Sequence, residues 1–288
     1  MNINVIGFAF GDTKIDQQKK YSDTFTNKTG IQTVYENTST SINLIEQAFQ
    51  NADGKDFKNA DAILHVTQSE HSFIPNDASL IQDFSGINNN VLSLTINQGC
   101  SGFVQALGIA NSLIESYGYK QILIITNDHY RKFIDVTDRA TDALFSDCAV
   151  ITSVNADEKF KVKKFINYTN GSGSKYLFRN KNIKMDGIEV FKFTKNIVIK
   201  DIIKKNIKSS DEDDSFYYIH QASAFVLNEI YQYLPENRCF SNLKSYGNTI
   251  SSTIPLLLKD FPLNKCKNYF IGFGVGLSAS FLELDYQV

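Results

Sequence analysis

Short apolar runs alternate along this chain with longer segments whose apolar residues recur at helical spacing. Runs of four to eight apolar residues bounded by turn residues are typical of buried strands, and spacings of three and four indicate amphipathic helices. We expect strands at 4–10, 62–66, 91–96, 121–126, 148–154, 216–219, 269–273 and 277–284, and helices at 41–49, 102–117, 187–208, 221–234 and 254–258. This alternation restricts the chain to an α/β fold with a buried sheet.

Strand–helix–strand units are expected in both halves of the 288-residue chain, which is compatible with a duplicated domain. The length is sufficient for one large domain or two modest ones. Between the halves, residues 155–184 contain an Asn-Gly-Ser-Gly-Ser run at 170–174 and many lysines. Such composition predicts a loop excursion.

Charge, hydropathy and cysteine spacing exclude several classes of protein. The net charge is -2 and the pI about 6.1, so no bulk basicity points to nucleic acid. Apolar runs such as 122–126 are too short to span a bilayer, and residues 1–6 lack the basic region of a signal peptide. Because the four cysteines include no C-x-x-C pair, a zinc knuckle is not expected. We expect a soluble protein of the reducing cytoplasm.

Cys100 is the candidate nucleophile. It lies in residues 97–103 (NQGCSGF), between a predicted strand and a predicted helix, and small neighbours allow the chain to turn sharply there. The N–H groups and partial positive charge of a helix N-terminus favour a thiolate, so we expect a lowered pKa. An inert buried cysteine is the alternative, and we interpret the other three cysteines in that way.

His220 occupies the same kind of position, between the strand 216–219 and the helix expected at 221–234. Asn248 lies in a loop, 246–252 (YGNTISS), that leads into an apolar helix. Taken singly, each has an ordinary structural interpretation: a satisfied imidazole and a helix-capping amide.

Taken together, the Cys-Ser-Gly-Phe elbow at 100–103, the His-Gln-Ala run at 220–222 and the Gly-Asn-Thr run at 247–249 resemble the β-ketoacyl-ACP synthase III family of the thiolase superfamily. Further similarities keep the same order along nearly the whole chain. They are Lys-Thr-Gly-Ile at 28–31, Thr-Asp-Arg-Ala at 137–140, Met-Asp-Gly-Ile-Glu-Val-Phe-Lys at 185–192 and Phe-Gly-Val-Gly at 273–276.

The resemblance implies a thiolase-like, five-layered α-β-α-β-α fold built from two pseudo-duplicated halves, usually as a homodimer. We expect the N-terminal half, with the nucleophile, at 1–157. The C-terminal half, with the histidine and the asparagine, is expected at 158–288. No metal or redox cofactor is implied, and the substrates would be acyl-CoA or acyl-carrier-protein thioesters.

The resemblance also implies an activity, a decarboxylative Claisen condensation by an acyltransferase. Cys100 would accept an acyl group, and the N–H groups of Cys100 and Val275 would form the oxyanion hole. His220 and Asn248 would donate hydrogen bonds to the enolate of a malonyl-type thioester. Substrate contacts would come from Gly274, Gly276 and Arg139 and, by analogy with the family, from Phe73 across a dimer interface.

Departures from the family pattern indicate a specialised pathway of secondary-metabolite or atypical fatty-acid synthesis. The chain has no tryptophan, whereas the family stacks one on the CoA adenine at the place of Thr24, opposite Arg139. The family's Gly-Asp-Gly-Ala is here Ser-Asp-Cys-Ala at 146–149. Two alternative functions stay open: acyl transfer to an alcohol or amine without decarboxylation, and a partner subunit of a heterodimeric ketosynthase.

A basic segment suggests an acidic partner. Residues 161–208 contain 13 Lys or Arg and 3 acidic residues, so this segment carries +10 and the remainder -12. Acyl carrier proteins are acidic, and complementary charge steers association. We expect Lys192, which falls on the family's docking lysine, and Lys195 to dock the carrier, although a solvated helix face is the commoner use of such residues.

Overall fold

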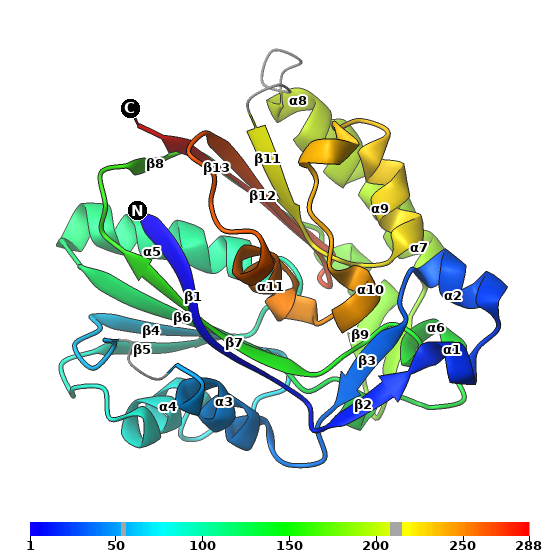
Figure 1. Cartoon of the computed structure of the whole chain (residues 1–288), viewed down its shortest axis with the longest axis horizontal. Coiled ribbons are helices and arrows are strands. Elements are labelled where there is room, and N and C mark those ends of the chain that lie inside the picture. Colours follow the sequence, from blue (N-terminus) through cyan, green and yellow to red (C-terminus); the bar gives the residue numbers. More distant parts are fainter. Residues whose placement is uncertain (53–55, 208–214, 288) are drawn as a thin grey trace.

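Two β-sheets form the frame of the molecule (Figure 1). The computed structural model describes residues 1–52, 56–207 and 215–287. The first sheet has the strand order β1 (Asn2–Phe10), β7 (Cys148–Asn155), β6 (Gln121–Asp128), β4 (Ala62–Val66) and β5 (Leu92–Ile96). The second has the order β11 (Ser215–Ile219), β12 (Lys267–Gly274), β13 (Ser278–Tyr286) and β8 (Phe160–Thr169).

The two sheets repeat one topology. When its strands are numbered in chain order, the first sheet has the order 1-5-4-2-3. The second sheet has the order 1-5-4-2 if β8, β11, β12 and β13 are numbered 1, 2, 4 and 5, with the number 3 left for a missing strand. A single parallel bridge between Tyr217 and Cys239 lies where the second sheet would have its strand 3. The strand directions agree as well. In both sheets strand 2 pairs with strand 4 in parallel, whereas strand 4 pairs with strand 5, and strand 5 with strand 1, in the antiparallel direction. The predicted duplication is therefore present.

Helices complete five layers. Between the sheets lie α5 (Gly102–Tyr117) and α11 (Thr253–Asp260), whose apolar side chains share one core with both sheets. The first sheet is covered outside by α3 (Ser41–Gln50) and α4 (Asp77–Ser85), as Figure 1 shows. The second is covered by α7 (Gly187–Phe193), its π-helical continuation Thr194–Ile203, α8 (Lys204–Asn206) and α9 (Ala224–Tyr231). The predicted five-layered architecture is confirmed.

Smaller elements connect these layers. They are β2 (Thr13–Asp16), β3 (Thr33–Glu36), β9 (Leu177–Arg179), β10 (Ile183–Met185), α1 (Gln17–Lys20), α2 (Asp23–Thr29), α6 (Arg139–Asp142), α10 (Leu243–Tyr246) and four 3-10 turns at Arg131–Phe133, Gly171–Tyr176, Glu236–Arg238 and Ile250–Ser252. Within the described ranges, no helix combines the length and apolar character that a membrane span requires.

The predicted strands are confirmed, but the loop expected at 155–184 is wrong. Residues 160–169 form β8, which pairs with β13 from Phe160 opposite Tyr286 to Thr169 opposite Ser278. This strand is at the edge of the second sheet and is largely exposed, so it carries lysines instead of an apolar run. Its pairing partner β13 is more than a hundred residues away along the chain. Without that partner in view, the local sequence is only a lysine-rich stretch, and such composition is typical of a loop.

Two helix boundaries also differ from the expectation. The helix expected at 221–234 begins only at Ala224, because the Ser223 hydroxyl caps it by accepting from the N–H of Val226. Before this cap, the Gln221 amide donates to the Ile219 carbonyl oxygen at 2.7 Å and holds the chain outside the helix. The helix expected at 187–208 is described as far as Asn206, and Lys208 lies outside the described residues.

The division of the chain into an N-terminal half at 1–157 and a C-terminal half at 158–288 stays a prediction.

His65 is the one imidazole in the middle of a sheet strand. It is fully buried on β4, and neither ring nitrogen has a hydrogen-bond partner among the described residues. Burial lowers the pKa of His65 to about 3, from 6.5. The unfolded chain therefore binds a proton here that the folded chain excludes, so stability falls as the pH falls below 6.5.

We predict that His65→Leu raises the free energy of unfolding at pH 7 by about 1–2 kcal/mol, since it removes two unpaired buried polar atoms. The gain should be larger at pH 5. Urea denaturation at both pH values measures it, with exposed His71→Leu as the control that leaves the pH dependence unchanged. Equal destabilisation at both pH values would contradict the prediction.

Candidate active site

Cys100, His220, Asn248 and Gly274 line one cavity of about 180 Å³. The first follows β5, the second follows β11, the third precedes α11 and the last ends β12. The other walls are mostly apolar, with Leu144, Phe145, Leu177, Met185, Val190, Phe191, Phe225, Val226 and Phe273. The structure thus brings together the three side chains that the sequence singled out for chemistry.

The Cys100 elbow lies directly against strand β12. A Cβ atom at Gly274 would lie 2.9 Å from Cys100 Cβ and 3.0 Å from its Sγ. At Gly272 it would lie 2.8 Å from the Cys100 carbonyl oxygen. Only glycine fits these positions without a shift of the elbow, so β12 fixes where the thiol sits.

The thiol is neutral at rest, and the lowered pKa expected from the sequence is wrong. Burial raises the pKa of Cys100 well above its usual range, and the nearby Asp128 carboxylate raises it further. The backbone N–H groups of Cys100 and Val275 favour the thiolate and offset part of this effect. The helix N-terminus is present, but the side chain is only 6% exposed and lacks the solvation that a thiolate needs.

Asp128 is a fully buried carboxyl near Cys100. Its carboxylate accepts from the Ser251 hydroxyl at 2.6 Å, the Ser251 N–H at 3.2 Å and the Gln68 N–H at 2.8 Å. Burial raises the pKa of Asp128 to about 7. The residue thereby links the end of β6 to the loop that carries Asn248.

His220 is buried and neutral. Its Nδ1 lies 2.7 Å from Thr253 Oγ1, and its ring meets Phe273 edge-on at 5.4 Å. Burial lowers the pKa of His220 to about 3. The imidazole therefore offers the cavity a hydrogen-bonding group that carries no charge.

The Asn248 amide is held in one orientation. Its Oδ1 accepts from the Ile250 N–H at 3.0 Å, and its Nδ2 donates to the Ala222 carbonyl oxygen at 3.3 Å. The backbone is fixed as well, since its N–H donates to Leu144 O and its carbonyl oxygen accepts from Ser146 N–H. Because an amide nitrogen has two hydrogens, one remains for the cavity.

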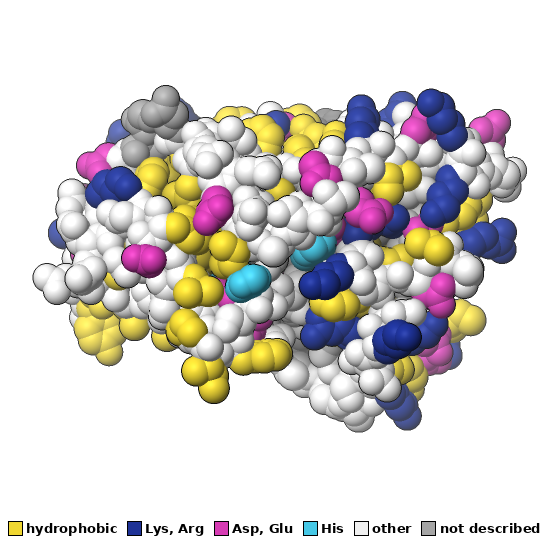
Figure 2. Space-filling model, turned by 90° about the horizontal axis from the view of Figure 1, so that it is seen from below, with side chains coloured by type: hydrophobic (Ala, Val, Ile, Leu, Met, Phe, Trp, Pro, Cys, Tyr) yellow, Lys and Arg dark blue, Asp and Glu magenta, His cyan; other side chains and the backbone are white. Residues whose placement is uncertain are grey.

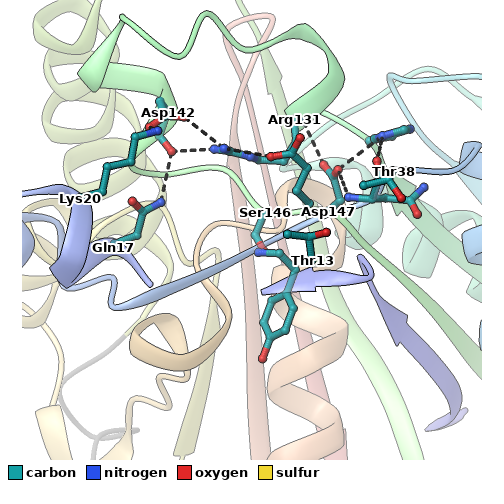
Figure 3. Close-up of polar contacts among 12 residues, drawn as sticks. Thr13, Gln17, Lys20, Thr38, Arg131, Asp142, Ser146 and Asp147 are labelled. Atoms are coloured by element: carbon teal, nitrogen blue, oxygen red, sulfur yellow. Dashed lines mark hydrogen bonds and ion pairs between the residues drawn. The ribbon is translucent and has the colours of Figure 1, made fainter. Parts of the chain in front are cut away.

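A buried ionic network supports the segment that pairs with Asn248 (Figure 3). The Arg131 guanidinium bonds Asp142 and Glu36, and Lys20 reaches Asp142 at 2.6 Å. Asp147 accepts from the N–H groups of Asn37 and Arg131. Burial raises the pKa of Asp147 to about 7.

The same network gives the altered Ser-Asp-Cys-Ala motif at 146–149 a structural use. Ser146 Oγ accepts from the Tyr35 N–H at 2.8 Å, and Cys148 is buried in β7. The segment 131–147 is thereby tied to β3, and this tie holds the backbone partners of Asn248 in place.

The remaining predicted site residues lie outside this cavity. Val275 lines a second cavity of about 240 Å³, and Gly276 follows it in the turn after β12. Arg139 is exposed on α6, with its guanidinium 5.5 Å from the centre of the Phe25 ring. The Phe73 side chain is 77% exposed and lines neither cavity.

The two lysines predicted to dock a carrier protein lie on the outer helix, and each has an acidic neighbour. Lys192 pairs with Glu189 at 2.6 Å, and Lys195 pairs with Glu229 at 3.0 Å. Lys195 also lies 5.7 Å from the ring centre of Phe191, a residue of the cavity wall. Of the two, Lys195 is therefore the one beside the cavity.

Sequence reasoning missed Asp128, Tyr130, Phe25 and Thr253. Asp128 and Tyr130 lie at the carboxyl end of a buried strand, a place where functional residues of α/β sheets gather, and this signal was available. Thr253 and Phe25 carried no such signal, because their partners are far away in sequence. Among the described residues, no group of three His, Cys, Asp or Glu is arranged to hold a metal.

Comparison with known proteins shows the family to which the chain is similar. Residues 94–172 match the family described as 3-oxoacyl-[acyl-carrier-protein (ACP)] synthase III, and residues 204–284 match its C-terminal part. The chain is 35% identical to a β-ketoacyl-[acyl-carrier-protein] synthase III of Acholeplasma laidlawii, over 71% of this chain and 69% of that one.

Two further relatives cover more of the chain. A protein of the same name from Geobacillus kaustophilus is 30% identical, over 84% of this chain and 80% of that one. The solved structure of a 3-oxoacyl-(acyl-carrier protein) synthase from Burkholderia xenovorans is 25% identical and superposes with a TM-score of 0.87, over 99% of this chain and 94% of that one.

We predict that Cys100 reacts with iodoacetamide at a rate that rises about tenfold per pH unit from pH 6 to pH 9, because the thiol form predominates throughout. Peptide mass spectrometry over time measures the rate, and Cys100→Ser identifies the peptide. A plateau below pH 7 would show a resting thiolate and contradict the raised pKa.

Proposed function

The chain belongs to the 3-oxoacyl-[acyl-carrier-protein] synthase III family and is thus an acyltransferase of the condensing type, and we propose that it works through an acyl-Cys100 intermediate. A malonyl-type thioester then loses CO2 and attacks this intermediate to give a β-ketoacyl thioester. The observation that carries the proposal is the single cavity shared by Cys100, His220 and Asn248.

In the first step the Cys100 sulfur attacks the carbonyl carbon of an acyl thioester. A bond forms from carbon to Sγ, the bond to the donor sulfur breaks, and the donor thiol leaves with the proton of Cys100. The N–H groups of Cys100 and Val275, which already favour negative charge at this sulfur, are suited to hold the tetrahedral oxyanion.

In the second step the malonyl carboxylate departs as CO2, and its electron pair passes into the thioester carbonyl as an enolate. The developing oxygen charge needs donors that do not give up a proton. Neutral His220 and the free Asn248 Nδ2 hydrogen have this character. The enolate carbon then attacks the acyl carbonyl, the bond from that carbon to Sγ breaks, and the released Cys100 thiolate takes a proton from solvent to restore the neutral thiol.

Thr253 is the hydrogen-bonding neighbour of His220 Nδ1. Its Oγ1 lies 2.7 Å from Nδ1 and donates its one hydrogen to the Ile250 carbonyl oxygen at 3.1 Å. In this step we propose that the hydroxyl hydrogen turns from Ile250 to Nδ1, so that Nε2 carries the imidazole hydrogen and donates into the cavity.

Phe25 and Arg139 support CoA as an acyl donor. The chain lacks tryptophan, but an aromatic ring lies opposite Arg139 all the same, since the guanidinium is 5.5 Å from the Phe25 ring centre. A planar base could stack on such a pair. Three further predictions concern the protein as a whole. We expect it to be cytoplasmic and to act in a specialised pathway. We also expect a homodimer in which Phe73 contacts the second copy.

An acidic carrier protein is the proposed macromolecular partner. On the face in Figure 2, Lys and Arg gather at the end where Figure 1 places α1, α2 and α6. Lys28 lies 5.4 Å from the ring centre of Phe225, a cavity-wall residue that is 47% exposed. Lys28 and Lys195 therefore flank the cavity mouth, a suitable arrangement for a carrier that delivers a thioester.

Intact-protein mass spectrometry tests the function. The protein is incubated with an acyl-CoA or acyl-carrier-protein donor, and malonyl thioester is added afterwards. We expect the acyl mass on Cys100, then its loss together with CO2 and a β-ketoacyl product. Acylation without any CO2 would refute condensation, and transfer to an alcohol or amine in the absence of malonyl thioester would favour the alternative reaction. Absence of acylation from every donor would favour a partner subunit.

We predict that His220→Ala and Asn248→Ala still accept the acyl group but condense about 10²–10³-fold more slowly, because each removes one enolate donor. Single-turnover assays that start from acyl-enzyme separate the two steps. Gln47→Ala, at an exposed position of α3, is the control. A variant that blocks acylation as strongly as condensation would assign its residue to the first step.

We predict that Lys28→Glu and Lys195→Glu raise KM for carrier-bound donor about tenfold at low salt, and that the effect shrinks as ionic strength rises. KM for a small thioester should not change. Lys192→Glu tests the second docking lysine in the same assay, and Lys161→Glu on the edge strand β8 is the control. Equal effects on both donors would count against carrier docking.

A further inference from the structure

A second cavity, of about 240 Å³, adjoins the first, and neither His220 nor Asn248 lines it. Leu177 lines both cavities, and Val275, whose N–H faces the Cys100 sulfur, lines the second. Cys100 and Tyr130 also belong to one buried cluster. An acyl group on Cys100 thus has a cavity beside it that the enolate donors do not occupy.

The walls of this second cavity are unusually rich in hydrogen-bonding groups. They include the side chains of Gln68, Asn97, Tyr130 and Arg179, next to apolar Leu177, Phe178, Ile183 and Val275. Buried Tyr130 donates its hydroxyl hydrogen to Gln68 Oε1 at 2.6 Å. Gln68 is thereby oriented with its acceptor satisfied, and its NH2 group forms no hydrogen bond within the described part of the chain.

The charged lining of the second cavity is positive. Arg179 is its only charged lining residue among those described, and none of the lining residues is acidic. The guanidinium lies 4.1 Å from the centre of the Phe133 ring, and no ion pair to Arg179 is present in the described ranges. Stacking fixes the guanidinium plane and leaves its N–H edge available for a planar anion such as a carboxylate.

The size of the cavity suits a short group. Its volume is about eight times the ~30 Å³ that a water molecule occupies in the liquid. A chain of a few carbons with a polar end fits such a space, whereas a long apolar chain would cover the partly buried Gln68 amide without giving it a partner, which is costly.

We propose that this cavity receives the distal end of the acyl group on Cys100 and selects acyl groups that end in a carboxylate. The inference rests on the proposed acyl-cysteine function. Arg179 binds the terminal carboxylate, the Gln68 amide donates to it, and Tyr130 positions that amide. The chemical step is unchanged, since the thioester carbonyl passes to Sγ and the donor thiol leaves with the proton.

The experiment compares glutaryl-CoA with pentanoyl-CoA, two thioesters of equal carbon number that differ in the terminal carboxylate. Acylation of Cys100 is followed by intact mass without malonyl thioester. We expect wild-type kcat/KM to favour glutaryl by about tenfold or more, and Arg179→Met to abolish this preference. Tyr130→Phe should reduce it, because Gln68 loses its anchor. Lys181→Met removes a nearby charge as the matched control and should retain the preference.

A second measurement does not depend on acylation. Free glutarate should slow the alkylation of Cys100 by iodoacetamide in the wild type and not in Arg179→Met, whereas pentanoate should protect neither. If pentanoyl-CoA acylates Cys100 as well as or better than glutaryl-CoA and glutarate gives no protection, the inference is wrong while the proposed function stands. If no thioester acylates Cys100, the proposed function fails and the inference fails with it.

Discussion

The close contact between the Cys100 elbow and strand β12 is the constraint on which the rest of the site depends. Gly272 and Gly274 remove every side-chain atom from this contact, so the two sheets approach through α5 and bring the β5 elbow to the end of β12. A Cβ atom at either glycine would push the sulfur away from the Val275 N–H and from the cavity that His220 and Asn248 line.

Burial determines the electrostatics of this centre. The thiol and the imidazole are both neutral at rest, and the buried carboxyl of Asp128 titrates near neutral pH. On Cys100 and on the substrate, negative charge therefore develops during the reaction, and backbone and amide hydrogens are placed to stabilise it. A site of this kind needs no permanent ion pair, and its hydrogen bonds serve to orient the reacting groups. Thr253 orients the His220 imidazole, and the backbone of Ala222 and Ile250 orients the Asn248 amide.

Much of the fold could be predicted because buried strands keep their apolar runs, as 62–66 and 121–126 do. The edge strand β8 could not, since its partner β13 is distant and its exposed face carries lysines. In the candidate site, Cys100, His220 and Asn248 were found from local context and motif order. The raised pKa of Cys100 was not, because it depends on burial and on Asp128, and neither is written in the elbow itself.

The repeated 1-5-4-2 strand order has a consequence for how such a site changes over time. The same strand of each repeat leads into the site: His220 follows strand 2 of the second sheet, and Gln68 comes shortly after strand 2 of the first. Both halves contribute to the walls of both cavities, but the imidazole comes from one repeat and the Gln68–Tyr130 pair from the other. Substitutions after strand 2 of the first sheet can therefore change the polar lining of the second cavity without altering the loop that carries the imidazole.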